Sequence, residues 1–214
     1  MPVLGSLDPL PRRPRRVLVA GTSGSGKTSV AVRIGVAFEL PHVEIDALFH
    51  GPGWTPRPSF VDDVHRFSAD PTWVTEWQYR AVRAHLAERA DLLVWLDLPR
   101  ALVMRQLARR TVVRRLCREQ LWNGNVEAPL WTVFTDREHI LRWAWNTHHE
   151  TAPRVRELLA RRPDLVAVRL RSRSEITHWL NGLTGVYAPG SAAPSSARLP
   201  RCGTRPGSPR ETPR

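Results

Sequence analysis

Residues 21–28 hold the side chains with the clearest chemistry in this 214-residue chain. They read GTSGSGKT and fill the pattern G-x-x-x-x-G-K-[ST] with Gly21, Gly26, Lys27 and Thr28. In this pattern, backbone N–H groups at a helix N-terminus bind phosphate, the lysine contacts the β- and γ-phosphates, and the hydroxyl binds Mg²⁺. The sequence therefore predicts that residues 21–28, called the phosphate loop below, form a site for ATP and Mg²⁺. The residues expected to bind the nucleotide are Gly21, Ser23, Gly24, Ser25, Gly26, Lys27, Thr28 and Ser29.

Lys27 is the only lysine among the 32 basic residues of the chain. A compact ammonium contacts phosphate as a point charge, and a planar guanidinium does not replace it well. The position of the single lysine therefore supports the phosphate site. It also excludes GTPases, because their base-reading N-K-x-D motif needs another lysine. The length argues against motors and helicases, so small-molecule kinases remain.

Two carboxylates are expected beside the phosphates, where parallel strands end. Asp46 is predicted to end the second strand, where it would bind an acceptor hydroxyl or a water on Mg²⁺. Glu76 follows the third strand, next to the phosphate-loop strand, where it would hold the water shell of the metal. The alternatives are a turn or helix cap for Asp46 and a solvent-facing position for Glu76. The candidate metal-binding residues are Thr28, Asp46 and Glu76.

Arginines recur at one helical face in the second half of the chain. Arg110, Arg114 and Arg118 are spaced i, i+4 and i+8, which places them on one side of a helix with few acidic partners. Such a face suits a lid, over about residues 105–128, whose arginines neutralise charge on a transferring phosphoryl group. The alternative is a solvated or RNA-facing surface. The candidate catalytic residues are Lys27, Asp46, Glu76, Arg110 and Arg114.

The elements that must position these residues are short apolar runs alternating with helical segments. This alternation predicts an α/β fold with a doubly wound, parallel, five-stranded sheet. We expect strands over 16–20, 42–46, 72–75, 91–97 and 164–169, and helices over 27–40, 59–67, 79–89, 99–119, 134–162 (interrupted at Pro153) and 174–183.

Composition separates the folded part from two basic ends. The formal net charge is +12, and much of it lies in the ends. We expect a flexible basic arm over residues 1–14, a kinase-like domain over 15–186 with an acceptor segment at about 47–71, and a disordered Pro/Ser/Arg tail over 187–214. Weak nucleic-acid contact through these ends stays open. Two cysteines, no signal-peptide pattern and no long apolar run favour a cytoplasmic protein without membrane contact.

Several segments also carry a family resemblance. They are GTSGSGKT, Asp46 followed by Pro52-Gly53-Trp54, the run ADLLVWLDLPR, the lid arginines and RWAW. Over about residues 15–180 the chain resembles the adenylate-kinase-related P-loop proteins known as DNA topology modulation proteins. The resemblance implies an adenylate-kinase-like fold, ATP binding and kinase activity on an undefined acceptor. That group usually has Asp-Gly-Asn-Tyr where this chain has Glu76-Trp77-Gln78-Tyr79, so Trp77 fills space beside the acceptor.

These features together predict an ATP-dependent phosphotransferase whose acceptor is a small molecule or a nucleotide. The alternative is a regulatory ATPase, or a protein whose nucleotide state governs its contact with nucleic acid. An enzyme and a binding protein differ in the contacts they need with the nucleotide. A kinase must neutralise the charge that develops on the transferring phosphoryl group, whereas a binding protein needs only contacts with the bound ground state.

Overall fold

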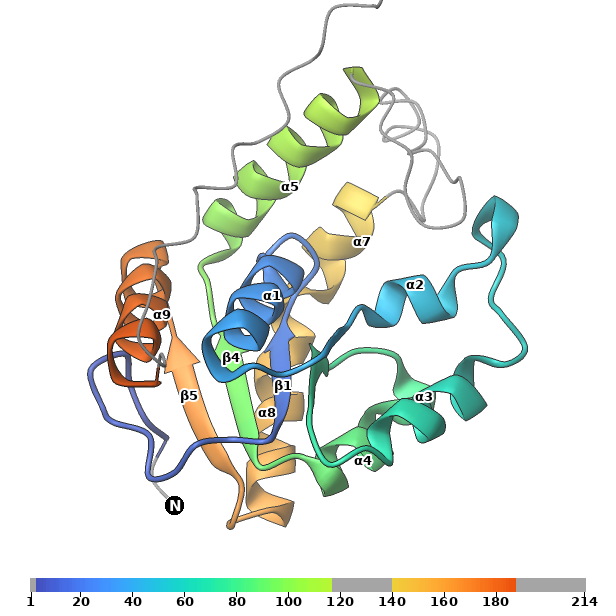
Figure 1. The fold of residues 1–214 in the computed structure, drawn as a ribbon. Coiled ribbons are helices and arrows are strands. Elements are labelled where there is room, and N and C mark those ends of the chain that lie inside the picture. The colour runs from blue at the N-terminus through green and yellow to red at the C-terminus, as the bar shows by residue number, and fades with distance from the viewer. Residues whose placement is uncertain (1–2, 117–139, 188–214) are drawn as a thin grey trace, which may run out of the picture.

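The computed structural model describes residues 3–116 and 140–187, which form an α/β fold around one parallel sheet (Figure 1). The strand order is β2-β3-β1-β4-β5, and every pairing is parallel. This confirms the predicted fold class. The strands are β1 (Arg16–Gly21), β2 (His42–Val43), β3 (Trp73–Glu76), β4 (Leu92–Leu96) and β5 (Val166–Leu170).

Helices connect the strands as parallel pairing requires, because the chain must cross back to the same end of the sheet before each new strand. The α-helices are α1 (Lys27–Phe38), α2 (Ile45–Phe49), α3 (Phe60–Ser68), α4 (Arg80–Arg89), α5 (Arg100–Leu116), α7 (Ile140–Thr147), α8 (Thr151–Arg161) and α9 (Arg173–Tyr187). The described residues also form the 3₁₀ helices η1 (Pro52–Trp54), between α2 and α3, and η3 (His148–Glu150), between α7 and α8. None of the helices in these described ranges is long and apolar enough to span a bilayer.

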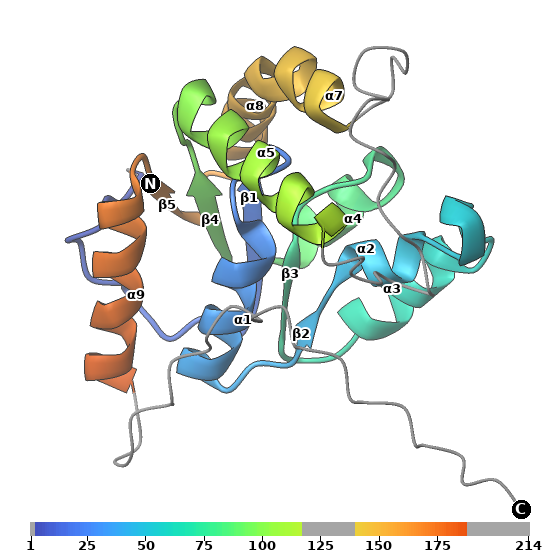
Figure 2. The ribbon, with the colours of Figure 1, turned by 90° about the horizontal axis from the view of Figure 1, so that it is seen from above.

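The core lies on both faces of the sheet, as alternating side chains of β1 show. Val17 and Val19 pack with residues of α1 and α9 on one face. Leu18 and Ala20 pack with residues of α3, α4 and α8 on the other. Figure 2 shows α1 and α9 on one side of the strands, and α8 on the opposite side. Burial on both faces explains why the central strands are apolar throughout.

The second strand is shorter than the sequence predicts. We expect a strand over 42–46, but β2 ends at Val43 and the chain enters α2 at Ile45. The Ile45 amide donates to the buried carboxylate of Glu76 (3.1 Å), so it is not available to a strand ladder. Asp46 therefore lies in the first turn of α2, where a negative charge is favourable, and not at a strand end.

The long helical region is interrupted before Pro153. We expect the break at the proline, but η3 separates α7 from α8 before it, and Pro153 lies in the first turn of α8. In a first turn the backbone N–H has no partner within the helix, so proline loses nothing there.

The N-terminal residues lie along the edge of the sheet. The Leu4 amide donates to the Ala167 carbonyl, and the Arg169 amide donates to the Leu4 carbonyl, both at 2.8 Å. Leu4 and Leu10 also pack against the core. Part of the segment expected to be a flexible arm therefore contacts β5. The tail beyond residue 187 and residues 117–128 of the expected lid lie outside the described residues.

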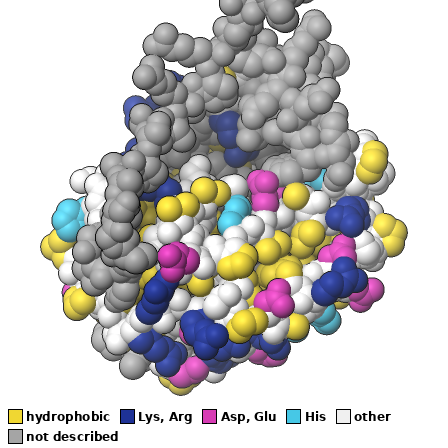
Figure 3. All heavy atoms as spheres, viewed as in Figure 1, with side chains coloured by type: hydrophobic (Ala, Val, Ile, Leu, Met, Phe, Trp, Pro, Cys, Tyr) yellow, Lys and Arg dark blue, Asp and Glu magenta, His cyan; other side chains and the backbone are white. Residues whose placement is uncertain are grey.

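Charges of both signs are interspersed on the face shown in Figure 3. Among the described residues, several exposed arginines pair with carboxylates, as Arg66 does with Asp63 (2.9 Å). Such exposed pairs contribute little to stability. The mixture of signs does, however, prevent the excess positive charge from forming one continuous basic surface over this face.

Leu4→Ala tests the attachment of the N-terminal segment. Leu4 is partly buried against the core, so the substitution is expected to lower the free energy of unfolding by about 1–2 kcal/mol, below the cost for a fully buried leucine. Urea denaturation measures the change. Leu7→Ala is the matched control, because Leu7 is 79% exposed and the substitution should change little. Equal stability of both variants would show that residues 3–10 do not pack on the sheet in solution.

Candidate functional site

The phosphate loop joins β1 to α1 and follows the geometry that its glycines allow. Gly24 and Gly26 have φ angles of 83° and 91°, in the left-handed region that favours glycine. A Cβ added at Gly24 would lie 2.8 Å from the Leu107 Cβ, so α5 also closely approaches the loop. Gly21 ends β1, Ser23 and Ser25 lie in the loop, and Lys27, Thr28 and Ser29 are the first three residues of α1.

The N-terminus of α1 is suited to an anion. No side chain caps it, and no acidic residue lies in its first turn. The first amides of a helix have no intrahelical acceptor, and the helix dipole adds partial positive charge there. The Ser25 hydroxyl is buried and has no hydrogen-bond partner among the residues that the structure describes. These groups fit the phosphates of a nucleotide.

Lys27 places a buried ammonium at the centre of this end of the sheet. Its side chain is 8% exposed, and its Nζ donates to the Thr22 carbonyl at 3.1 Å. Burial lowers the pKa of Lys27; the charges of Asp46 and Glu76 oppose this effect, and the charge of Arg110 adds to it. The charge state of Lys27 therefore depends on three other predicted site residues: Asp46 on α2, Glu76 on β3 and Arg110 on α5.

Asp46 is oriented by two residues that follow β3. Gln78 Nε2 and Tyr79 Oη both donate to Asp46 Oδ1, at 2.5 and 2.6 Å. Burial and the charge of Asp46 together raise the pKa of Tyr79 above its ordinary value, so its hydroxyl remains a donor. The Phe49 ring stacks on Tyr79 with 4.0 Å between centroids. The network therefore fixes the orientation of the Asp46 carboxylate.

Tyr79 adopts a backbone conformation that is uncommon for a bulky residue. Its φ is 60°, which costs on the order of 1–3 kcal/mol at such positions. The hydrogen bond to Asp46 and the stacking on Phe49 stabilise this strained conformation. Gln78 and Tyr79 are not among the site residues predicted above; the only sequence signal for them is their place in the tetrapeptide after the third strand.

Glu76 is the last residue of β3 and is 1% exposed. Its Oε1 lies 3.1 Å from His42 Nε2, and its Oε2 accepts from the Ile45 amide. Burial alone would raise the pKa of Glu76, but these hydrogen bonds outweigh it and hold the pKa below its ordinary value. Glu76 thus ties β3 to the start of α2 and thereby positions Asp46. It does not face solvent, and binding of a metal's water shell by Glu76 stays a prediction.

α5 brings one of the two candidate arginines to the loop. The charge of Arg110 acts on Lys27, and Leu107, one turn before it, packs against Gly24. The Gln106 amide also lies beside the loop, and in the orientation that satisfies its hydrogen bonds its nitrogen donates to the Gly24 carbonyl at 3.1 Å. The backbone of Arg114 lies one turn further along α5, but its side chain and the whole of Arg118 lie outside the described part.

The donors present fit Mg²⁺ that arrives with a nucleotide. No group of three His, Cys, Asp or Glu side chains forms a metal cluster within 3–116 and 140–187. Protein-bound Mg²⁺ commonly uses only one or two protein ligands together with substrate phosphates and water. The Thr28 hydroxyl and the Asp46 carboxylate offer oxygen atoms of this kind, and their binding of Mg²⁺ stays a prediction.

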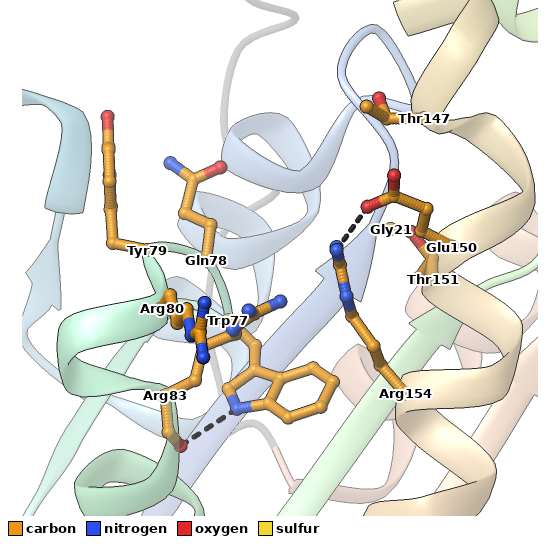
Figure 4. A pocket seen from close by; sticks show the side chains of 10 residues that line it. All are labelled: Gly21, Trp77, Gln78, Tyr79, Arg80, Arg83, Thr147, Glu150, Thr151 and Arg154. Carbon is orange, nitrogen blue, oxygen red and sulfur yellow. Dashed lines mark hydrogen bonds and ion pairs between the residues drawn. The ribbon is translucent and has the colours of Figure 1, made fainter.

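A cavity of about 400 Å³ opens beside the first residue of the loop (Figure 4). Gly21 forms part of its wall, and Gln78 and Tyr79 connect that wall to Asp46. The expected acceptor segment, 47–71, does not supply these walls; through Phe49 it packs against Tyr79. The other lining residues are Trp77, Arg80, Arg83, Thr147, Glu150, Thr151 and Arg154. The sequence does not predict that these polar residues share a site, because α4 and α8 lie far apart in the chain.

Comparisons with solved structures find small kinases. The chain is similar to a gluconokinase from Sinorhizobium meliloti 1021, with 22% identity over 82% of this chain and 95% of that one, and a TM-score of 0.47. A sugar kinase from Janibacter is 19% identical over 86% and 91% (TM-score 0.40), and a shikimate kinase from Bacteroides thetaiotaomicron is 13% identical over 81% and 98% (TM-score 0.42). No protein-family model and no curated protein sequence matches the chain.

Glu76→Gln tests the junction between β3 and α2. The substitution keeps the shape but removes the charge that strengthens the bonds to His42 and Ile45, so we expect a loss of about 1.5–3 kcal/mol at pH 7. Because the folded pKa is lowered, the ionised carboxylate stabilises the fold above the usual glutamate pKa. That stabilisation is lost as the pH falls through the folded value. The gap between parent and variant should therefore close in acid.

Urea unfolding at a series of pH values, from neutral to about pH 3, measures this gap. Glu88→Gln on α4 is the control, since Glu88 is exposed and its loss should change stability little at any pH. A gap that stays constant over the whole series would contradict the role given to the Glu76 charge.

Proposed function

We propose that this protein is an ATP-dependent phosphotransferase that moves the γ-phosphoryl group of ATP to the hydroxyl of a small molecule. The observation that carries this proposal is the buried Lys27 ammonium. It lies at the N-terminus of α1 within the field of Asp46, Glu76 and Arg110. A phosphate held there meets a cation on the loop, a guanidinium on α5 and a carboxylate beside the neighbouring cavity.

Each group has a task in binding and transfer. The amides of the loop and of the first turn of α1 bind the phosphates, together with Lys27. Thr28 and Asp46 would hold Mg²⁺, and the metal would neutralise phosphate charge when bound. Arg110 neutralises the charge that gathers on the transferring group, an interaction worth most in the transition state.

For the transfer itself, the protein must align the acceptor oxygen with the γ-phosphorus, and it forms no covalent bond of its own. The acceptor oxygen forms a bond to the γ-phosphorus, while the bond from that phosphorus to the β–γ bridging oxygen breaks. The electron pair of the broken bond leaves on ADP. The acceptor proton passes to the Asp46 carboxylate and from there to water. Both hydrogen bonds that orient Asp46 end on Oδ1, so we assign both of its proposed roles, towards the acceptor and towards Mg²⁺, to Oδ2.

Lys27→Met tests nucleotide binding. Mg·ATP at a hundredfold excess over its dissociation constant is expected to stabilise the parent by about 2.7 kcal/mol. The variant should lose most of this gain, because methionine fills the space of lysine without its charge. Thermal unfolding with and without Mg·ATP measures the effect. Arg33→Met, on an exposed part of the same helix, should keep the full shift. An equal shift in Lys27→Met would remove the basis of the proposal.

Arg110→Ala separates catalysis from binding. The ATP dissociation constant should stay within about tenfold, or roughly 1.4 kcal/mol. Turnover should fall by about a hundredfold or more, since an arginine that acts on the transferring group contributes about 10³–10⁵ in phosphoryl-transfer enzymes generally. Single-turnover release of ADP, measured beside ATP binding, gives both values.

The control for this experiment is Arg105→Ala, which removes an exposed arginine from the same helix and should leave both values unchanged. If Arg110→Ala turns over like the parent, Arg110 takes no part in transfer and the catalytic role given to α5 is wrong.

A further inference from the structure

The cavity beside the phosphate loop is lined by more positive than negative side chains. Three arginines and one glutamate line its volume of about 400 Å³. Arg80 and Arg83 come from α4, whereas Arg154 comes from α8 on the opposite wall (Figure 4). A volume of this kind accommodates a small organic molecule.

The arginines are held together against their mutual repulsion. Burial lowers the pKa of Arg83, the charges of Arg154 and Arg80 lower it further, and the charge of Glu150 opposes them. Glu150 is already in an ion pair with Arg154, four residues along the chain. The Glu150 carboxylate therefore offsets only part of the positive charge in the cavity. An anion bound between the walls would offset the rest.

Trp77 contacts Arg83, which is partly buried, whereas Arg80 and Arg154 are exposed. Its indole Nε1 donates to the Arg83 carbonyl at 3.1 Å, and the Arg83 guanidinium lies 6.0 Å from the centre of the indole ring. The planar N–H groups of a guanidinium beside an aromatic ring suit bidentate contact with a carboxylate or phosphate. The tryptophan thus shapes the cavity as well as filling space.

The two ends of the cavity differ in their chemistry. Gln78 and Tyr79 lie on its wall and bond to Asp46, and Gly21 begins the phosphate loop. A molecule in the cavity would therefore have one end near Asp46 and the loop, and another end near the arginines of α4 and α8. The first end suits the hydroxyl that receives the phosphoryl group, and the second suits an anionic group.

We infer that the acceptor is a small hydroxylated anion, and that Arg80, Arg83 and Arg154 bind its carboxylate or phosphate group. This inference deepens the proposed function and rests on it. The arginines fix the anionic end, so the hydroxyl is directed towards Asp46. Neutral polyols lack the group that offsets the cavity charge, and they are rejected.

The first experiment measures binding with three matched probes: glycerate, glycerol 3-phosphate and glycerol. Calorimetry should detect binding of at least one of the two anions, and glycerol should not bind. A preference for one anion over the other tells whether the cavity takes carboxylate or phosphate. Failure of both anions to bind at millimolar concentrations, or equal binding of glycerol, would overturn the inference.

Variants then locate the bound anion. Arg83→Gln and Arg80→Gln should each weaken anion binding by about tenfold or more while the fold is kept, because removing one of several repelling charges does not destabilise it. Arg156→Gln is the matched control, since Arg156 is exposed on the same helix as Arg154 and does not line the cavity. It should bind the anion like the parent.

Lys27→Met separates this inference from the proposed function. An anion bound in the cavity keeps its affinity in Lys27→Met, whereas an anion bound on the phosphate loop loses it. Affinity that depends on Lys27 and not on Arg83 would overturn the cavity site while leaving the nucleotide site intact. Conversely, anion binding that depends on Arg83 in a protein that does not bind ATP would refute the phosphotransferase and retain the anion site.

Discussion

The buried ammonium group of Lys27 governs the arrangement of charge at the carboxyl end of the sheet. Burial works against the charged form, so the surroundings must supply compensation. It comes from the Thr22 carbonyl within the loop and from two carboxylates on other elements. The strand order makes this possible, because β1 lies next to β3 and the two strands end side by side. A phosphate would add negative charge where the loop amides and Arg110 are also placed to meet it.

Glu76 links the electrostatics of the site to the path of the chain. Its carboxylate binds the Ile45 amide where β2 ends, at the point where the chain enters α2 and brings Asp46 to the loop. The same carboxylate acts on Lys27 through its charge. One buried group therefore positions a neighbour and adjusts the pKa of another. The strained backbone of Tyr79, in the connection between β3 and α4, is held by its bond to Asp46 and completes the arrangement.

The cavity shows how a sheet with helices on both faces creates a site that no single segment contains. One wall comes from the β3–α4 connection and α4, and the other from η3 and α8. Both α4 and α8 pack against β1, so the cavity lies directly beside the phosphate loop. The ion pair between Glu150 and Arg154 spans one turn at the start of α8 and leaves the α4 arginines facing it across the cavity. Charge, shape and position thus come from separate elements.

The parallel α/β architecture, the glycine-rich loop after β1 and the position of Lys27 at the start of α1 could all be predicted from the amino-acid sequence. These features are local: apolar runs, glycines that permit left-handed angles, and a helix that starts at a known residue. Three other features emerge only from the folded chain: Asp46 lies in α2 and not at a strand end, Glu76 bonds to His42 and Ile45, and α4 and α8 share a cavity. Those contacts join residues far apart in the chain, with a separation of 34 positions for His42 and Glu76. Neither periodicity nor spacing records such pairs, because they form only when the strands align and the helices pack.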